Sequence, residues 1–156
     1  MKKTNWYVIT GAPSSGKTKL IEHLSFLNYN TIPEAARIYI DQKLSEGNTI
    51  KNLREDEGKF QKKVLQMKID VEKKVNPDVL TFFDRGILDS IAYYSILGLD
   101  LKSVISANKM IYKGIFFLES LDTYDITDTA RVENLKTAEK LEKLLEQSYT
   151  DYGYKV

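Results

Sequence analysis

The sequence predicts an α/β protein with three layers, in which helices cover both faces of a parallel sheet of about five strands. Short, continuous apolar runs alternate with longer segments whose apolar residues recur every three or four positions. The first apolar run leads directly into the glycine-containing segment "GAPSSGKT" at residues 11–18. With 156 residues, 42% hydrophobic and 29% charged, the chain has the size and balance of one globular domain.

The expected elements follow one another along the chain. Residues 6–10 are β-branched and aromatic and form the first strand, and the helical pattern of residues 16–27 begins inside the glycine segment. "GYKV", residues 153–156, has the composition of a further strand. We therefore expect residues 1–156 to form a single domain that lacks its last strand and C-terminal segment. The other expected strands are 28–33, 78–84 and 113–119, the other helices are 34–47, 55–75, 87–97 and 133–149, and the polar residues 120–131 form a loop.

Composition excludes several classes of function. The 23 basic and 22 acidic side chains give a net charge of +1, so the chain has no overall attraction for nucleic acid or for an anionic membrane. No cysteine is present, which excludes disulfides and thiolate metal sites. The N-terminal apolar run is too short for a signal peptide, and no run approaches the roughly 18 apolar residues of a membrane span. We expect a cytoplasmic protein that binds neither nucleic acid nor membrane, and a homodimer is left open.

The segment at residues 11–18 matches the phosphate-loop (Walker A) pattern G-x-x-x-x-G-K-[ST] in full. Its glycines permit backbone conformations in which several N–H groups converge on one point, and the following helix adds its positive N-terminal dipole there. The lysine would reach the β- and γ-phosphates of a nucleotide, and the threonine hydroxyl would bind Mg²⁺. The expected nucleotide-binding residues are Gly11, Ala12, Pro13, Ser14, Ser15, Gly16, Lys17 and Thr18.

Two charged residues follow the strand "VLTFFD". In a phosphate-loop fold, Asp84 at the strand tip lies beside the Thr18 hydroxyl, so both become candidate ligands of Mg²⁺. The alternative for Asp84 is the N-cap of the next helix. Arg85 has a guanidinium suited to bidentate contact with phosphoryl oxygens, and its alternative is a salt bridge to a neighbouring helix.

Further charged and aromatic residues are candidates for binding an acceptor. Glu34 and Arg37 are three residues apart after the second strand, where α/β sheets bind ligands, although a surface ion pair explains them equally well. Asp89 and Tyr93 are four residues apart on one helix and could face the same pocket. Arg131 ends the polar loop, and a loop arginine there could close over phosphates.

Four segments in this order, "GAPSSGKT", "IPEAAR", "FFDRGILDSIAYY" and "IFFLESLDTYDITDTAR", resemble the AAA-domain family of small phosphate-loop (P-loop) NTPases. That family is similar to the ribosylnicotinamide kinases, and the "DR" segment also resembles thymidylate and deoxynucleoside kinases. The resemblance implies a kinase-like P-loop fold with Lys17 and Thr18 on nucleotide and metal, Asp84 with the metal, and Arg131 in a lid. The family continues past "GYKV" through a last strand and a segment near the adenine base.

These observations favour an ATP-dependent phosphotransferase that uses Mg²⁺ and ATP, or GTP, and acts on a small hydroxyl-bearing acceptor such as a nucleoside or nucleotide. Glu34 or Asp84 would orient or deprotonate the acceptor hydroxyl. The alternative is a nucleotide-hydrolysing or nucleotide-binding regulatory module without a small-molecule acceptor. The expected catalytic residues are Lys17, Glu34, Asp84, Arg85 and Arg131.

Overall fold

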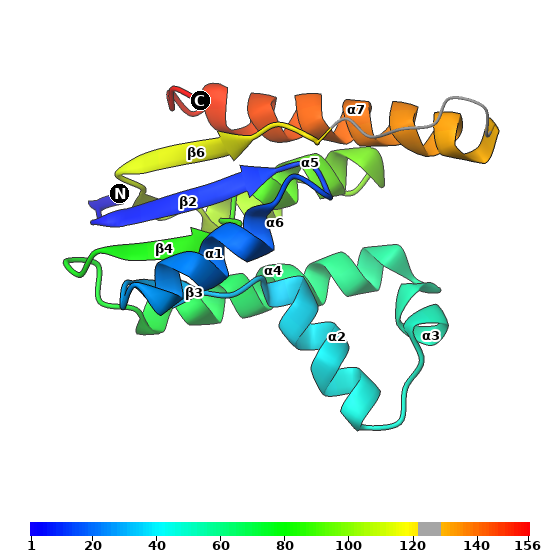
Figure 1. The fold of residues 1–156 in the computed structure, drawn as a ribbon, viewed down its shortest axis with the longest axis horizontal. Helices are drawn as coiled ribbons and strands as arrows, with labels where there is room; N and C mark the ends of the chain where they lie inside the picture. Colours follow the sequence, from blue (N-terminus) through cyan, green and yellow to red (C-terminus); the bar gives the residue numbers. More distant parts are fainter. Residues whose placement is uncertain (122–128) are drawn as a thin grey trace.

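The computed structural model describes residues 1–121 and 129–156, with side chains given outside residues 122–135. Strands and helices alternate along most of the chain (Figure 1). The strands are β1 (Lys2–Lys3), β2 (Trp6–Gly11), β3 (Asn30–Ile32), β4 (Thr81–Asp84), β5 (Met110–Ile111) and β6 (Gly114–Leu118). The helices are α1 (Lys17–Phe26), α2 (Ala35–Ser45), α3 (Ile50–Arg54), α4 (Glu57–Lys74), α5 (Asp89–Ile96), α6 (Lys102–Ala107) and α7 (Thr129–Thr150).

The main sheet has the strand order β3-β4-β2-β6, and all of its strands are parallel. A separate parallel pair joins β1 to β5. Within the main sheet Ile9 of β2 lies opposite Asp84 of β4, so the carboxyl ends of these two strands are neighbours. The phosphate-loop sequence after β2 therefore begins beside the end of β4, at the edge where parallel sheets bind ligands.

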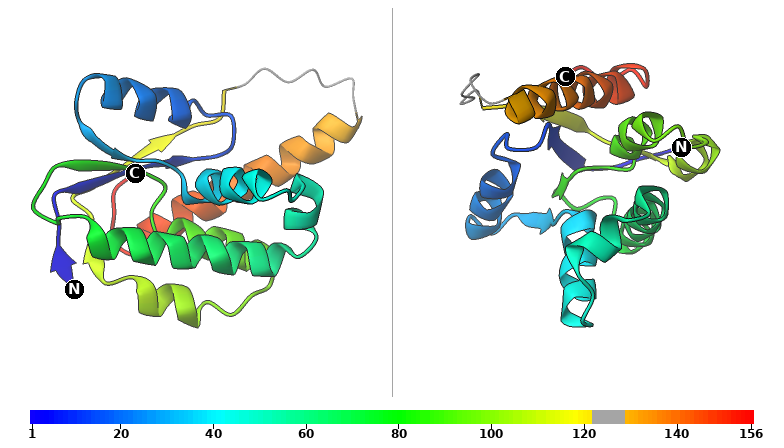
Figure 2. Two further views of the ribbon diagram at one scale, coloured as in Figure 1. Left: turned by 90° about the horizontal axis from the view of Figure 1, so that it is seen from below. Right: turned by 90° about the vertical axis from the view of Figure 1, so that its right-hand side faces the viewer.

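Helices cover both faces of the main sheet, which confirms the predicted three-layer α/β/α fold. Helix α1 packs on one face, and α4, α5 and α7 pack on the other (Figures 1 and 2). Trp6 and Val8 point toward the second group, because alternate residues of a strand face opposite sides. None of the described helices is both long and apolar enough to cross a lipid bilayer.

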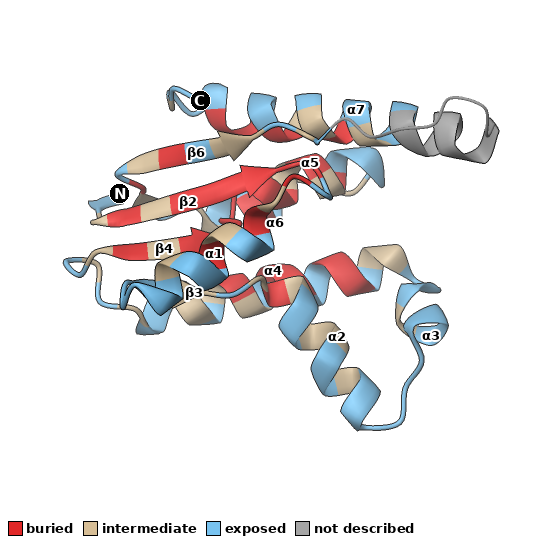
Figure 3. Ribbon diagram, viewed as in Figure 1, coloured by how far each residue is buried: buried red, intermediate tan, exposed pale blue. Residues whose placement is uncertain are grey.

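The main core lies between the sheet and α4, α5 and α7. Trp6 is completely buried, its ring lies 4.9 Å from that of Phe83, and its indole N–H donates to the backbone oxygen of Asn76 at 3.1 Å. Leu88 and Tyr149 pack into the same cluster. Figure 3 shows the buried residues concentrated on β2 and on the inward sides of α4, α5 and α7. This core fixes the strand ends from which the candidate site is built.

The main sheet has four strands in the described part of the chain, one fewer than expected. Residues 153–156, expected to begin another strand, instead end a turn and continue without regular structure. The pair β1–β5 and the short helices α3 and α6 were not predicted, because segments of two to six residues are too short to show a period. Most of the expected polar loop, residues 122–128, lies outside the described residues, and α7 begins at Thr129, within that expected loop.

Candidate active site

The loop between β2 and α1 has the backbone that its glycines predict. Gly11, Ser14 and Gly16 have φ angles of 142°, 62° and 90°. A Cβ atom on Gly11 would lie 2.1 Å from the backbone oxygen of Leu118 on β6, so no other residue fits without moving that strand. Glycine at position 11 is therefore required by both the backbone angle and the neighbouring strand.

The backbone amides of residues 14–16 find no hydrogen-bond acceptor among the described residues. Free amides at the start of a helix form a site that attracts anions. Lys17 closes over the loop, because its ammonium donates to the backbone oxygen of Ala12 at 3.3 Å and to the Ser15 hydroxyl at 3.5 Å. Burial and the nearby Arg85 guanidinium lower the pKa of Lys17, whose side chain would gain a partner when a phosphate binds.

Asp84 ends β4 with a carboxylate that is 5% exposed. Its Oδ1 atom has no hydrogen-bond partner in the described structure, and buried carboxylate oxygens are rarely left in that state. Burial, and next the charge of Glu34, raise the pKa of Asp84 to about 6. The alternative role as a helix N-cap is not observed, because Leu88 occupies the N-cap of α5. An unpaired buried oxygen next to a phosphate loop fits a bound cation.

Arg85 is held in place by three side chains. Its Nε donates to Glu34 at 3.3 Å, its Nη1 donates to Asp89 at 3.1 Å, and its guanidinium lies 5.6 Å from the centre of the Tyr93 ring. Its φ angle of 66° is rare for a residue with a side chain and turns the backbone away from the strand direction. The surface ion pair between Glu34 and Arg37, the alternative to acceptor binding, does not form: Glu34 binds Arg85 instead, and Arg37 is exposed.

Asp89 is completely buried and surrounded by hydrogen-bond donors. It accepts hydrogen bonds from Arg85, from the amide of Gly86 at 2.8 Å, and from the hydroxyls of Thr10 and Tyr149. Burial opposes its ionisation, but the positive charges of Arg85 and then Lys68, together with the hydroxyl hydrogen bonds, outweigh burial and lower the pKa of Asp89. Both of its oxygens are engaged, so we propose that Asp89 positions Arg85 and does not itself touch an acceptor.

Replacing Tyr149 with phenylalanine should destabilise the protein by about 1–3 kcal/mol, because a buried carboxylate loses one donor. Chemical denaturation of the wild type and the variant measures the change in the free energy of unfolding. Tyr152→Phe is the matched control, since Tyr152 is 39% exposed. If the two variants have the same stability, the hydroxyl of Tyr149 has no special part in supporting Asp89.

A pocket of about 250 Å³ opens beside the phosphate loop. Glu34, Arg85 and Tyr93, three of the residues predicted to bind an acceptor, line it together with Pro13 of the loop. Three further polar residues line it that were not singled out in the sequence: Arg54, Gln61 and Lys68. The pattern of α4 contained a signal for the last two, because they are polar residues on the side of the helix that also carries Val64.

The remaining predicted residues differ in their placement. Lys17, Glu34, Asp84 and Arg85 lie close enough to influence one another's charge, so the structure brings this group together. Thr18 lies in the first turn of α1. The backbone at Arg131 belongs to α7, but its side chain lies outside the described residues. Among the described residues, no three carboxylate or histidine side chains gather as metal ligands.

Comparison with known families identifies the fold. The family model described as "AAA domain" matches residues 6–156, nearly the whole chain. The chain belongs to the AAA-domain family. No curated protein sequence matches this AAA-domain chain.

Three solved structures resemble this AAA-domain chain in fold. The NadR protein in complex with NR aligns with a TM-score of 0.67 and 15% identity over 96% of this chain, and the chain spans 43% of the NadR chain. Thymidylate kinase from Ehrlichia chaffeensis gives 0.55 and 14% over 97% of this chain and 87% of its own. YorR from Bacillus subtilis, in complex with phosphorylated GDP, gives 0.50 and 11% over 96% and 82%. At these identities the likeness concerns the fold.

Proposed function

We propose that this AAA-domain protein binds ATP or GTP with Mg²⁺ and transfers the γ-phosphoryl group to a small acceptor, a nucleoside or nucleotide. One observation carries the proposal: the free amides and Lys17 of the phosphate loop lie next to a pocket lined by Glu34 and Arg85. A nucleotide-hydrolysing module has no need of such a pocket. The names of the structural neighbours, a thymidylate kinase and a protein bound to phosphorylated GDP, support the same class of acceptor.

The residues would divide the work as follows. The loop amides and Lys17 hold the β- and γ-phosphates, while Thr18 and Asp84 hold Mg²⁺, which neutralises charge on the phosphates when bound. Asp89 and Glu34 orient Arg85, so its guanidinium is already in place to contact a phosphoryl oxygen and loses little conformational entropy when it does so. Arg131 remains a proposed lid residue, and Arg37 a proposed acceptor contact, although Arg37 does not line the pocket.

The transfer itself would follow an in-line displacement. An acceptor oxygen forms a bond to the γ-phosphorus while the bond from that phosphorus to the bridging oxygen breaks, and the nucleoside diphosphate leaves with that oxygen. When the acceptor oxygen belongs to a hydroxyl, its proton passes to Glu34, which is half-buried at the pocket wall. When the acceptor oxygen is already ionised, no proton has to be removed.

An acceptor panel with γ-labelled ATP tests the proposal. The protein is incubated with labelled ATP, Mg²⁺ and, one at a time, the common nucleosides and nucleoside monophosphates. We expect the label to appear on at least one acceptor, with a rate that depends on the acceptor concentration. Release of the label only as inorganic phosphate, at a rate that no acceptor changes, would contradict transfer and favour hydrolysis.

A further inference from the structure

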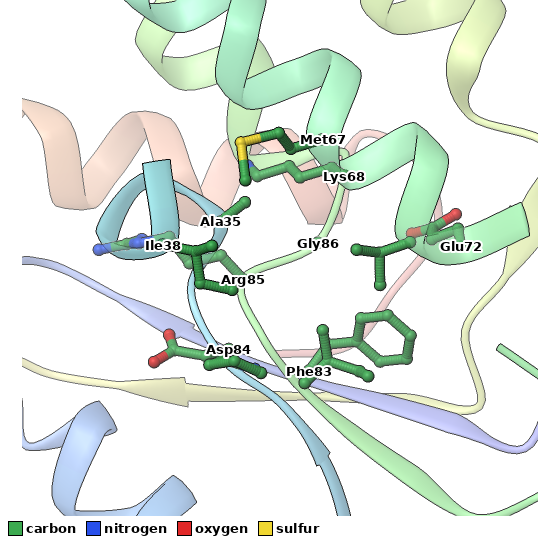
Figure 4. Close-up of a pocket in the computed structure, with 12 residues that line it drawn as sticks. Ala35, Ile38, Met67, Lys68, Glu72, Phe83, Asp84, Arg85 and Gly86 are labelled. Carbon is green, nitrogen blue, oxygen red and sulfur yellow. The ribbon is translucent and has the colours of Figure 1, made fainter. Parts of the chain in front are cut away.

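Lys68 of α4 is a buried lysine that forms no ion pair with any of the described residues. Its side chain is drawn in Figure 4, where it extends from the same helix as Met67 and Glu72, across from Asp84 and Phe83 of β4. The residue is 8% exposed, and its one hydrogen bond runs from Nζ to the hydroxyl of Ser90 at 3.2 Å. No carboxylate of the described residues lies within 4.0 Å of its ammonium group.

Such a lysine is costly, because a buried ammonium group normally requires a negative partner. The ammonium has three donors and uses one of them. The nearest carboxylates are already engaged: Asp89 accepts from four donors, Glu34 accepts from Arg85, and Glu72 accepts from the Tyr112 hydroxyl at 2.6 Å. Burial lowers the pKa of Lys68, and the charges of these carboxylates counter that effect only in part. None of these described carboxylates forms an ion pair with Lys68, so an anionic ligand would be its first direct negative partner.

Lys68 lines the same pocket as Glu34, Arg85 and Pro13, so its free donors are available to a bound molecule there. Gln61 lines that pocket too and is 5% exposed, and its side-chain amide has no partner among the described residues. The two residues are seven positions apart on α4, two helical turns, or about 10 Å along the axis. The pocket thus offers a positive group and a neutral hydrogen-bonding group at different points along its wall.

We propose that Lys68 binds an anionic group of the acceptor, so that the pocket selects charged acceptors over neutral ones, and that Gln61 binds a neutral polar group of the same molecule. This inference rests on the proposed function, since it names the class of acceptor for that site. Phosphate and carboxylate share the chemistry that an ammonium recognises, and the experiment separates them.

The test uses three matched series of ligands that differ only at the 5′ position: nucleosides, nucleoside 5′-carboxylates and nucleoside 5′-monophosphates. Each is titrated calorimetrically into protein saturated with a non-hydrolysable ATP analogue and Mg²⁺. We expect at least one charged series to bind about tenfold or more tightly than the nucleosides. Lys68→Met should remove that advantage and change nucleoside affinity less than about twofold. Lys63→Met, an exposed lysine on the same helix, should change neither.

Equal affinity for the three series in the wild type, or binding by none of them, would overturn the inference, and so would an equal loss for charged and neutral ligands in Lys68→Met. Lys68→Gln should give the same result and serves if the methionine variant folds poorly. Failure of the ATP analogue to bind is a separate outcome that refutes the proposed function. In that case the charged ligands are titrated into Lys17→Ala and Lys68→Met without the analogue. Binding that persists in Lys17→Ala but is lost in Lys68→Met belongs to the acceptor pocket and supports the inference about Lys68.

Discussion

Lys17→Ala is expected to lose nearly all of the thermal stabilisation that Mg²⁺ and ATP give to the wild type. The ammonium group of Lys17 lies over the phosphate loop, where it donates to the Ala12 carbonyl and the Ser15 hydroxyl. A charged hydrogen bond to a phosphate is worth about 1.5–3 kcal/mol, so ATP affinity should fall by about 10- to 150-fold. A thermal melt with and without nucleotide measures the shift.

Lys19→Ala is the matched control for that experiment. Lys19 lies two residues further along α1 and is exposed, so the variant should keep the wild-type response to nucleotide. Melts without ligand show whether either substitution changes the fold itself. Equal nucleotide shifts in the wild type and in Lys17→Ala would refute the assignment of the loop to phosphate binding.

Asp84→Asn is expected to have two opposite effects. The ligand-free protein should become more stable at neutral pH, because the variant no longer buries an ionised carboxylate without a partner. The pKa rise of Asp84 from 3.8 to about 6 limits this gain to about 3 kcal/mol. Mg²⁺-dependent binding of ATP should weaken by at least about tenfold, because an amide is a poor substitute for a carboxylate as a magnesium ligand.

The pH dependence of the stability gain follows from the direction of the pKa shift. A raised carboxyl pKa stabilises the folded state while the group is protonated, and that contribution is lost as the pH rises from about 4 through about 6. The difference in Tm between Asp84→Asn and the wild type should therefore grow over this range and then stay constant. Magnesium binding by the wild type should strengthen over the same range, since the metal needs the ionised form.

Asp78→Asn provides the comparison, because Asp78 precedes the same strand and is exposed. The free energy of unfolding of Asp78→Asn should equal that of the wild type at every pH. Burial raises the pKa of Glu72 to about 7, but Glu72 is present in both proteins, so its effect on the pH dependence cancels in the comparison. If Asp84→Asn is less stable than the wild type at pH 7.5, Asp84 has a stabilising partner, and its proposed role as a free metal ligand fails.

The parts of the site that sequence could predict are those fixed by local structure. The phosphate loop is one continuous segment whose glycines, lysine and flanking strand and helix all serve the same conformation, so its pattern is readable without the fold. The position of Asp84 was predictable because the carboxyl ends of parallel strands form the edge where such sheets bind ligands. The layered architecture followed from the alternation of apolar runs and amphipathic segments.

The parts that sequence could not predict depend on contacts between distant segments. Arg85 binds Glu34, which is 51 positions away, as well as the nearby Asp89, and only the strand order brings Arg85 and Glu34 together. The engagement of Asp89 with Tyr149 spans 60 positions. The helical pattern places Lys68 on the side of α4 that carries Val64, but its burial and its bond to Ser90 depend on how α4 packs against α5. Pairing of this kind has no periodic signature.

Trp6 is the one tryptophan of the chain, and it is buried in the core in contact with Phe83. Phe83 directly precedes Asp84, the candidate metal ligand. The tryptophan emission therefore comes from one residue, which is shielded from water in the folded state. Emission would shift to longer wavelength only when the sheet itself opens to water. The emission of Trp6 therefore reports global unfolding. Substitutions in the phosphate loop or the acceptor pocket should leave the emission wavelength of the folded protein unchanged.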